Sequence, residues 1–151
     1  MRIAISISGK RGQTKGRITG EKNDLSITYN HLKKNILEKY NSDIFIHTWD
    51  KEDHKYFKET FKTEFVISEE QKNFGFDLHN MNEIEKNDEY GKGSEFRAIS
   101  QTYSFFKSLD LVIKNEVKSN FVYDFIICMR ADALICKFIN FKKLKKNFIY
   151  V

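Results

Sequence analysis

The sequence predicts an α/β domain with a Rossmann-like, open and mostly parallel sheet flanked by helices. Short isoleucine-rich segments alternate with helical patterns, a rhythm typical of parallel strands joined by right-handed crossovers. Polar or charged residues directly follow the apolar segments, at the sheet edge where open α/β folds bind ligands. A chain of 151 residues is long enough for one domain with a substantial core, so residues 1–151 are expected to form a single domain.

The first strand is predicted at residues 2–8, where Ile3, Ile5 and Ile7 alternate with small residues. It ends in the basic, glycine-containing turn Ser8-Gly9-Lys10-Arg11-Gly12. Such a turn can bring backbone amides close to a nucleotide or a phosphate, because glycine lets the backbone approach. The turn matches neither of the two common glycine-rich phosphate-binding motifs, so a plain connecting turn is an equal alternative.

A helix is expected next, followed by a second strand. Apolar residues from Ile27 to Tyr40 recur at helical spacing, and Asp24 or Ser26 is the expected N-cap. The segment 43–50 then predicts a short buried strand, which ends in the polar and aromatic residues His47, Thr48, Trp49 and Asp50. His47 is either a hydrogen-bonded core residue or a base, and Trp49 either packs in the core or stacks on a ligand.

The middle of the chain predicts a helix at 52–62, a third strand at 64–68 and the longest helix at 94–120, capped by Ser94. Residues 69–93 lack periodicity and are interpreted as a lid or a surface loop. The face of the long helix that packs on the sheet is expected to carry five large residues: Ile99, Tyr103, Phe106, Leu109 and Ile113. Arg97, Gln101 and Lys107 on this helix either reach the ligand crevice or face solvent.

The fourth strand is the most informative segment. The apolar run from Phe125 to Met129 predicts a strand buried on both faces, and Arg130 and Asp132 follow two residues apart on the same side. These two residues form either a mutual ion pair or a metal-and-phosphate site, in which Asp132 is the ligand and Arg130 the orienting cation. Cys128 and Cys136 are expected to be reduced core residues.

Beyond this strand, Phe138, Phe141 and Leu144 predict one or two helical turns, and residues 148–151 resemble the start of another strand. A strand at the end of the chain suggests a domain that is incomplete at its C-terminus. No apolar run approaches the ~18 residues of a membrane helix, and no signal peptide is evident, so a cytoplasmic location is expected. The net charge of +5 comes from lysines spread along the chain, with one dense cluster at 142–146, and nucleic-acid binding is therefore disfavoured.

Four short motifs, in this order and spacing, resemble a known group of proteins. They are Ser8-Gly9-x-Arg11, then Phe45-Ile46-His47-Thr48-Trp49, then Ser100-Gln101-x-Tyr103-Ser104-x-x-Lys107-Ser108, and last Tyr123-Asp124-Phe125-Ile126-Ile127-x-x-Arg130-x-Asp132. Together they resemble bacterial and viral glycosyltransferase-like proteins of the GT-A, nucleotide-diphosphosugar transferase fold, from Arg2 to about Val151.

The resemblance implies the donor-binding half of such a domain, which transfers a sugar from a nucleotide-sugar donor to a glycan or polysaccharide acceptor. It implies that six residues bind the donor: Ser8, Gly9, Arg11, Trp49, Gln101 and Arg130. An Asp-x-Asp motif would hold Mn²⁺ or Mg²⁺; here Arg130 stands at the first position and Asp132 is the remaining metal ligand. His47 and Asp50 are the candidates for the catalytic base. The alternatives are a non-catalytic remnant that binds a nucleotide or a partner and, less favoured, a basic nucleic-acid-binding protein.

Overall fold

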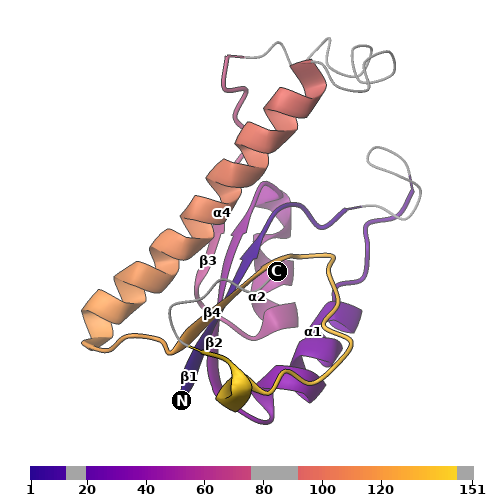
Figure 1. Ribbon diagram of the computed structural model, residues 1–151. Helices are drawn as coiled ribbons and strands as arrows, with labels where there is room; N and C mark the ends of the chain where they lie inside the picture. Colours follow the sequence, from indigo (N-terminus) through magenta and orange to yellow (C-terminus); the bar gives the residue numbers. More distant parts are fainter. Residues whose placement is uncertain (13–19, 76–91, 146–151) are drawn as a thin grey trace.

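The computed structural model describes residues 1–12, 20–75 and 92–145. They form an α/β arrangement in which a sheet of four parallel strands lies between two helical layers (Figure 1). The predicted fold class is confirmed at this level, since an all-parallel sheet flanked by helices is compatible with a Rossmann-like fold. Among the described residues, no helix has the length and apolar character that crossing a membrane requires.

The strands and helices lie close to the predicted ranges. The strands are β1 (Arg2–Ser8), β2 (Asn41–Thr48), β3 (Val66–Ser68) and β4 (Phe125–Arg130). The helical segments are α1 (Ser26–Leu32), the π-helical η1 (Lys33–Leu37), the 3₁₀ turn η2 (Lys51–Asp53), α2 (His54–Phe61), α4 (Lys92–Ser119) and the 3₁₀ turn η3 (Phe141–Lys143). Because α4 begins at Lys92, Ser94 lies inside the helix and is not its cap.

The strand order β3-β2-β1-β4 makes β1 the centre of the sheet. Ile5 of β1 lies opposite Ile44 of β2 on one side and Ile127 of β4 on the other. The chain moves outward from β1 to β2 and β3, and it then crosses back to place β4 on the opposite side of β1. In such sheets the point where the strand order reverses leaves a crevice at the carboxyl ends of the strands. That point lies here between β1 and β4.

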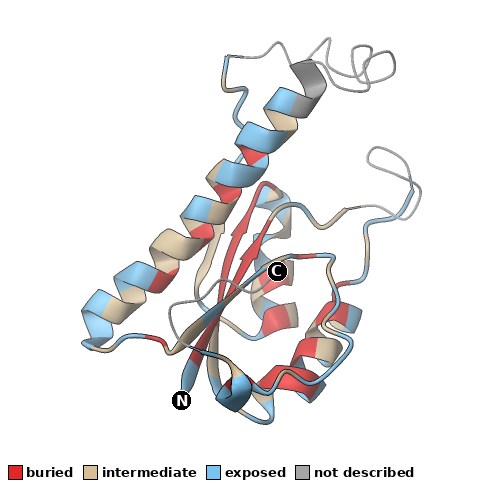
Figure 2. Ribbon diagram, in the orientation of Figure 1, coloured by how far each residue is buried: buried red, intermediate tan, exposed pale blue. Residues whose placement is uncertain are grey.

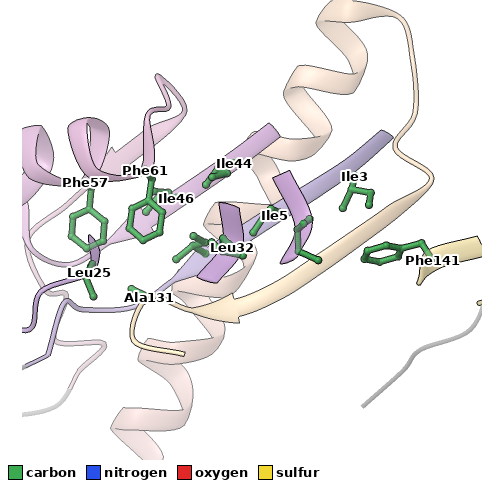
Figure 3. Close-up of a cluster of buried hydrophobic side chains, with 12 residues drawn as sticks. Ile3, Ile5, Leu25, Leu32, Ile44, Ile46, Phe57, Phe61, Ala131 and Phe141 are labelled. Carbon is green, nitrogen blue, oxygen red and sulfur yellow. The ribbon is translucent and has the colours of Figure 1, made fainter. Parts of the chain in front are cut away.

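The main core lies between the sheet and the layer formed by α1 and α2 (Figure 3). Ile3, Ile5 and Ile7 are fully buried, as the alternation in β1 predicts. They pack with Leu32 of α1 and with aromatic side chains of α2, including Phe57 and Phe61. This face of the sheet holds the fold together and leaves the opposite face of the same strands for α4.

The expected orientation of α4 is wrong. Ile99, Phe106 and Ile113 are exposed by 44, 62 and 56%, while Tyr103 and Leu109 are half-buried. The buried residues of the helix recur every four positions, and they are Ser100, Ser104, Ser108 and Val112. Figure 2 shows the buried positions along the side of α4 that faces the strands.

Small side chains on both partners explain this packing of α4. The face of β1 toward the helix carries Ala4, Ser6 and Ser8, and Ser6 and Ser108 are joined by a hydrogen bond of 2.7 Å between their hydroxyls. Serine opposite alanine and serine lets the helix approach the sheet closely. A face of isoleucine and phenylalanine would hold the helix further away.

The expectation that β4 is buried on both faces is also wrong. Its residues alternate between half-buried and exposed, and Ile126 is 44% exposed. The reason is that α4 packs on β1 and β2, so that the described residues leave the adjoining face of β4 uncovered. Both cysteines are free as predicted, but Cys128 on this face and Cys136 after the strand are exposed and not in the core.

Two expectations about α1, its buried face and its N-cap, can also be compared with the structure. Ile27 is 54% exposed, although Leu32 and Ile36 of the same predicted helix are buried. The N-cap of α1 is Leu25, which makes no side-chain cap hydrogen bond, so the expectation that Asp24 or Ser26 caps the helix is wrong. Asp24 does accept a hydrogen bond from the backbone N–H of Ser26 at 2.9 Å. The predicted strand at 148–151 and most of the irregular segment 69–93 lie outside the described residues.

Candidate functional site

A groove of about 520 Å³ lies between α4 and the carboxyl ends of β1 and β4. It occupies the crevice that the reversal of strand order creates beside β1. It brings together three of the predicted donor-binding residues, Ser8, Gln101 and Arg130, from three different elements. The remaining lining residues are Ala98, Thr102, Phe105, Cys128 and Met129.

Arg130 and Asp132 form a bidentate ion pair at the end of β4. The Nε of Arg130 donates to Oδ1 of Asp132 at 2.9 Å, and its Nη2 donates to Oδ2 at 2.7 Å. This hydrogen bonding and the carboxylate charge raise the pKa of Arg130. The Arg130 side chain is 64% exposed, so solvent screens the pair and a competing anion can reach the guanidinium. The mutual ion pair, one of the two expected alternatives, is therefore present.

The donor set around Asp132 does not form a prepared metal centre. Asp132 supplies one carboxylate, and both of its oxygens already accept from Arg130. In the part of the chain that the structure describes, no group of three or more histidine, cysteine or acidic residues lies close enough together to hold an ion. A divalent cation here would first have to displace Arg130 and then take most of its oxygen ligands from a bound molecule or from water.

The turn after β1 has two backbone amides that are already bonded within the protein. The N–H of Gly9 lies 3.1 Å from the carbonyl oxygen of His47 and 3.0 Å from Oγ of Ser104. The N–H of Arg11 donates to Oδ2 of Asp50 at 2.6 Å. Phosphate-binding turns present free amides to the ligand, so these two do not form such a cradle.

The side chain of Arg11 lies away from the groove. Its guanidinium carbon is 3.7 Å from the centre of the Tyr56 ring, its Nε donates to the carbonyl oxygen of Asn23, and Nη1 is 3.9 Å from Asp53. The side chain is 17% exposed. Arg11 thus ties the turn to the start of α2, and its guanidinium already has anionic and aromatic partners.

His47 is fully buried between β2 and α4. Its Nδ1 lies 2.7 Å from Oγ of Ser104, and its Nε2 faces Oε1 of Glu69 at 3.5 Å without a hydrogen bond to any described residue. Burial lowers the pKa of His47 to about 4, although the nearby carboxylate of Glu69 acts in the opposite direction. The imidazole is therefore neutral at pH 7, and no part of it is open to solvent.

Trp49 and Asp50, the other predicted residues at the end of β2, are engaged within the protein. Trp49 is 6% exposed, and its ring stacks on Tyr103 of α4 with the ring centres 5.2 Å apart. Asp50 accepts a hydrogen bond from the backbone N–H of Arg11. Neither residue lines the groove.

Glu69 is a residue that the sequence did not single out. Its carboxylate lies within 3.4 Å of Lys72 and 3.7 Å of Lys107, as well as facing His47. Partial burial raises the pKa of Glu69, but the hydrogen bond from Lys72 and the charges of Lys72, His47 and Lys107 outweigh this effect and lower it. Lys107, which was expected either at the crevice or in solvent, instead belongs to this charge cluster.

The groove residues that the sequence missed fall into two groups. Cys128 lies two positions before Arg130 on β4. Residues two apart on a strand point to the same side, so this spacing was a signal that Cys128 lies beside Arg130. Thr102 and Phe105 lie on α4, whose orientation was wrongly predicted, and no sequence signal pointed to them.

Comparisons of the chain with protein-family models, with curated proteins and with solved structures found no match. The resemblance to GT-A-fold glycosyltransferases therefore stays a prediction from the four sequence motifs.

Proposed function

We propose that the groove binds the diphosphate of a nucleotide sugar and that the protein is a glycosyltransferase-like protein of the GT-A type. The observation that carries the proposal is the position of Arg130. It lies at the point where the strand order reverses, lines an open groove, and is exposed enough to exchange its carboxylate partner for a phosphate. Arginine is the cation best suited to such an exchange, because its guanidinium matches phosphate oxygens with two parallel hydrogen bonds.

Arg130 has a definite role in this proposal. When a sugar is transferred, negative charge develops on the departing nucleoside diphosphate, and a guanidinium placed at that phosphate stabilises the charge. Gln101 and Ser8 add neutral hydrogen-bonding groups to the same groove. The acceptor would be a glycan or a polysaccharide. A divalent cation bound by Asp132 is the alternative way to neutralise the diphosphate.

A second function, a module that binds a nucleotide or a partner without turnover, is favoured by one observation. Of the two candidate bases, His47 is inaccessible to solvent and Asp50 is bonded to the amide of Arg11. A base must reach the hydroxyl from which it removes a proton, directly or through one water molecule. Sugar transfer to any acceptor, or hydrolysis of the donor, would decide in favour of the enzyme.

The test is calorimetric titration with UDP, GDP and CMP, each with and without Mn²⁺. We expect Arg130→Gln to weaken the binding of the preferred nucleotide by roughly 10- to 100-fold, the usual contribution of a charged hydrogen bond. Lys143→Gln removes an equal charge from η3, outside the groove, and is expected to leave the affinity nearly unchanged.

Asp132→Asn separates the two ways of holding the diphosphate. If Arg130 contacts the phosphate directly, removing its competing carboxylate leaves binding intact or strengthens it, with or without Mn²⁺. If a cation bridges Asp132 and the phosphate, the same substitution abolishes the part of the affinity that depends on Mn²⁺. Failure of all three nucleotides to bind the wild-type protein under both conditions would contradict the proposal.

A further inference from the structure

The side of α4 that points away from the sheet carries a row of exposed apolar residues, which we call the outer stripe: Ile99, Phe106, Ile113 and Val117. They are exposed by 44, 62, 56 and 78%. Steps of seven and four residues keep them on one side of the helix, opposite the buried serines. Asp110, which pairs with Lys114 at 2.6 Å, lies on the same side between Phe106 and Ile113 and interrupts the stripe at one position. The solvent side of a helix packed on a sheet is ordinarily polar, so four exposed apolar residues there indicate a surface that something covers.

The spacing of the outer stripe is symmetric. Ile99 and Ile113 each lie seven residues from Phe106, one before it and one after it. If a second copy of α4 packs antiparallel to the first, with the two Phe106 rings meeting at the twofold axis, each Ile99 faces the Ile113 of the other copy. A seven-residue repeat is also the spacing that keeps an apolar seam between two helices crossing at about 20°.

Charges at the two ends of α4 favour the same orientation. Glu95 lies at the beginning of the helix, whereas Lys118 lies at its end. An antiparallel pair centred on Phe106 places Glu95 of one copy opposite Val117 of the other and one residue from Lys118, at both ends of the contact. A parallel pair would place Glu95 beside the Glu95 of the other copy, and Lys118 beside the other Lys118. Like charges would then repel each other at both ends of the contact.

We infer that the outer stripe is the interface of a homodimer in which two α4 helices pack antiparallel about Phe106. None of the outer-stripe residues belongs to the groove lining, although Thr102 of that lining borders the stripe. The inference therefore does not depend on the proposed function, and either can fail without the other.

The first test is the molar mass in solution, measured by light scattering and sedimentation over a range of concentrations. We expect the wild-type protein to reach twice its chain mass of 18.0 kDa. Phe106→Glu would place two carboxylates against each other at the twofold axis, and we expect this variant to remain a monomer. Val122→Glu is the matched control, because Val122 is as exposed as Val117 but lies outside the helix; this variant is expected to dimerise normally. A wild-type protein that stays monomeric at submillimolar concentration would overturn the inference, and the outer stripe would then face another partner.

The second test examines the orientation of the helices. Glu95→Lys and Lys118→Glu are each expected to weaken the dimer, and the double variant is expected to restore it. Both substitutions are unfavourable for the α4 helix by itself, because they oppose its dipole. Recovery in the double variant therefore requires a contact between copies. If both single variants weaken the dimer and the double variant does not recover, the antiparallel arrangement is wrong.

Discussion

At His47, burial sets the charge of the imidazole and makes the stability of the fold depend on pH. Burial lowers the pKa of His47 from 6.5 to about 4, so the folded protein holds the neutral ring while the unfolded chain binds a proton below pH 6.5. The free energy of unfolding should therefore be highest above pH 6.5 and should fall as the pH drops toward 4, by roughly 3 kcal/mol from this residue. Denaturant unfolding at pH 7 and pH 4 measures the change.

The control for this prediction is His47→Gln, which keeps a polar side chain and removes the titration. Carboxyl groups, including that of Glu69, also contribute to the loss of stability in acid. The quantity to compare is therefore the change in the free energy of unfolding between the two pH values in each protein. We expect the variant to lose less stability than the wild type between pH 7 and pH 4. An equal loss in both proteins would mean that His47 does not titrate in this range.

In the helix α4, the sequence predicted the position and length well and the orientation badly. Ile99, Phe106 and Ile113 drew attention because apolar residues at helical spacing usually face a core. The competing pattern was Ser100, Ser104 and Ser108, which are small residues four positions apart and allow close packing on a sheet. Periodicity locates a face, but it cannot tell a tightly packed face of serines from an apolar face that packs on another molecule. Thr102 and Phe105, which line the groove from α4, were missed for this reason.

Enlarging a buried serine of α4 tests this orientation. We expect Ser108→Leu to lower the free energy of unfolding by about 1–3 kcal/mol or more, because the added atoms have no space between the helix and Ser6 of β1. Ser119→Leu makes the same change at the exposed end of the same helix and is expected to change stability by less than about 0.5 kcal/mol. If the two variants unfold at the same denaturant concentration, the packing of α4 described above is incorrect.

For the molecule as a whole, the rhythm of strands and helices in the sequence was enough to predict a parallel sheet. The expectation of a site at the carboxyl ends of the strands also follows from that rhythm, since ligands bind where polar residues follow parallel strands. The strand order that places β1 beside β4 was not predicted. What the sequence could not supply was the set of contacts that engage individual residues. In the sequence, nothing indicates that Arg11 has a partner within the protein. In the structure its guanidinium contacts Tyr56 and Asp53, about forty residues later in the chain.

The two exposed cysteines offer a test of the groove in the intact protein. Cys128 lines the groove and Cys136 does not, and burial raises the pKa of the Cys128 thiol. In single-cysteine variants, Cys136→Ser and Cys128→Ser, we expect a thiol reagent to modify both residues, with slow reaction at Cys128 because less of it is thiolate. A nucleotide that binds as proposed should protect Cys128 and leave the rate at Cys136 unchanged. Equal rates at Cys128 with and without a saturating nucleotide would place the bound molecule elsewhere.

The central position of β1 has a consequence for the order in which the chain can fold. β1 begins at Arg2, but one of its two neighbours, β4, begins at Phe125. Pairs such as Ile3 and Phe125 close a very long loop, and contacts of this kind form late and slowly. A chain emerging from the ribosome can assemble β1, β2 and β3 well before β4 exists. We therefore expect the groove between β1 and β4 to be among the last features of the protein to form, so that ligand binding reports on the completion of folding.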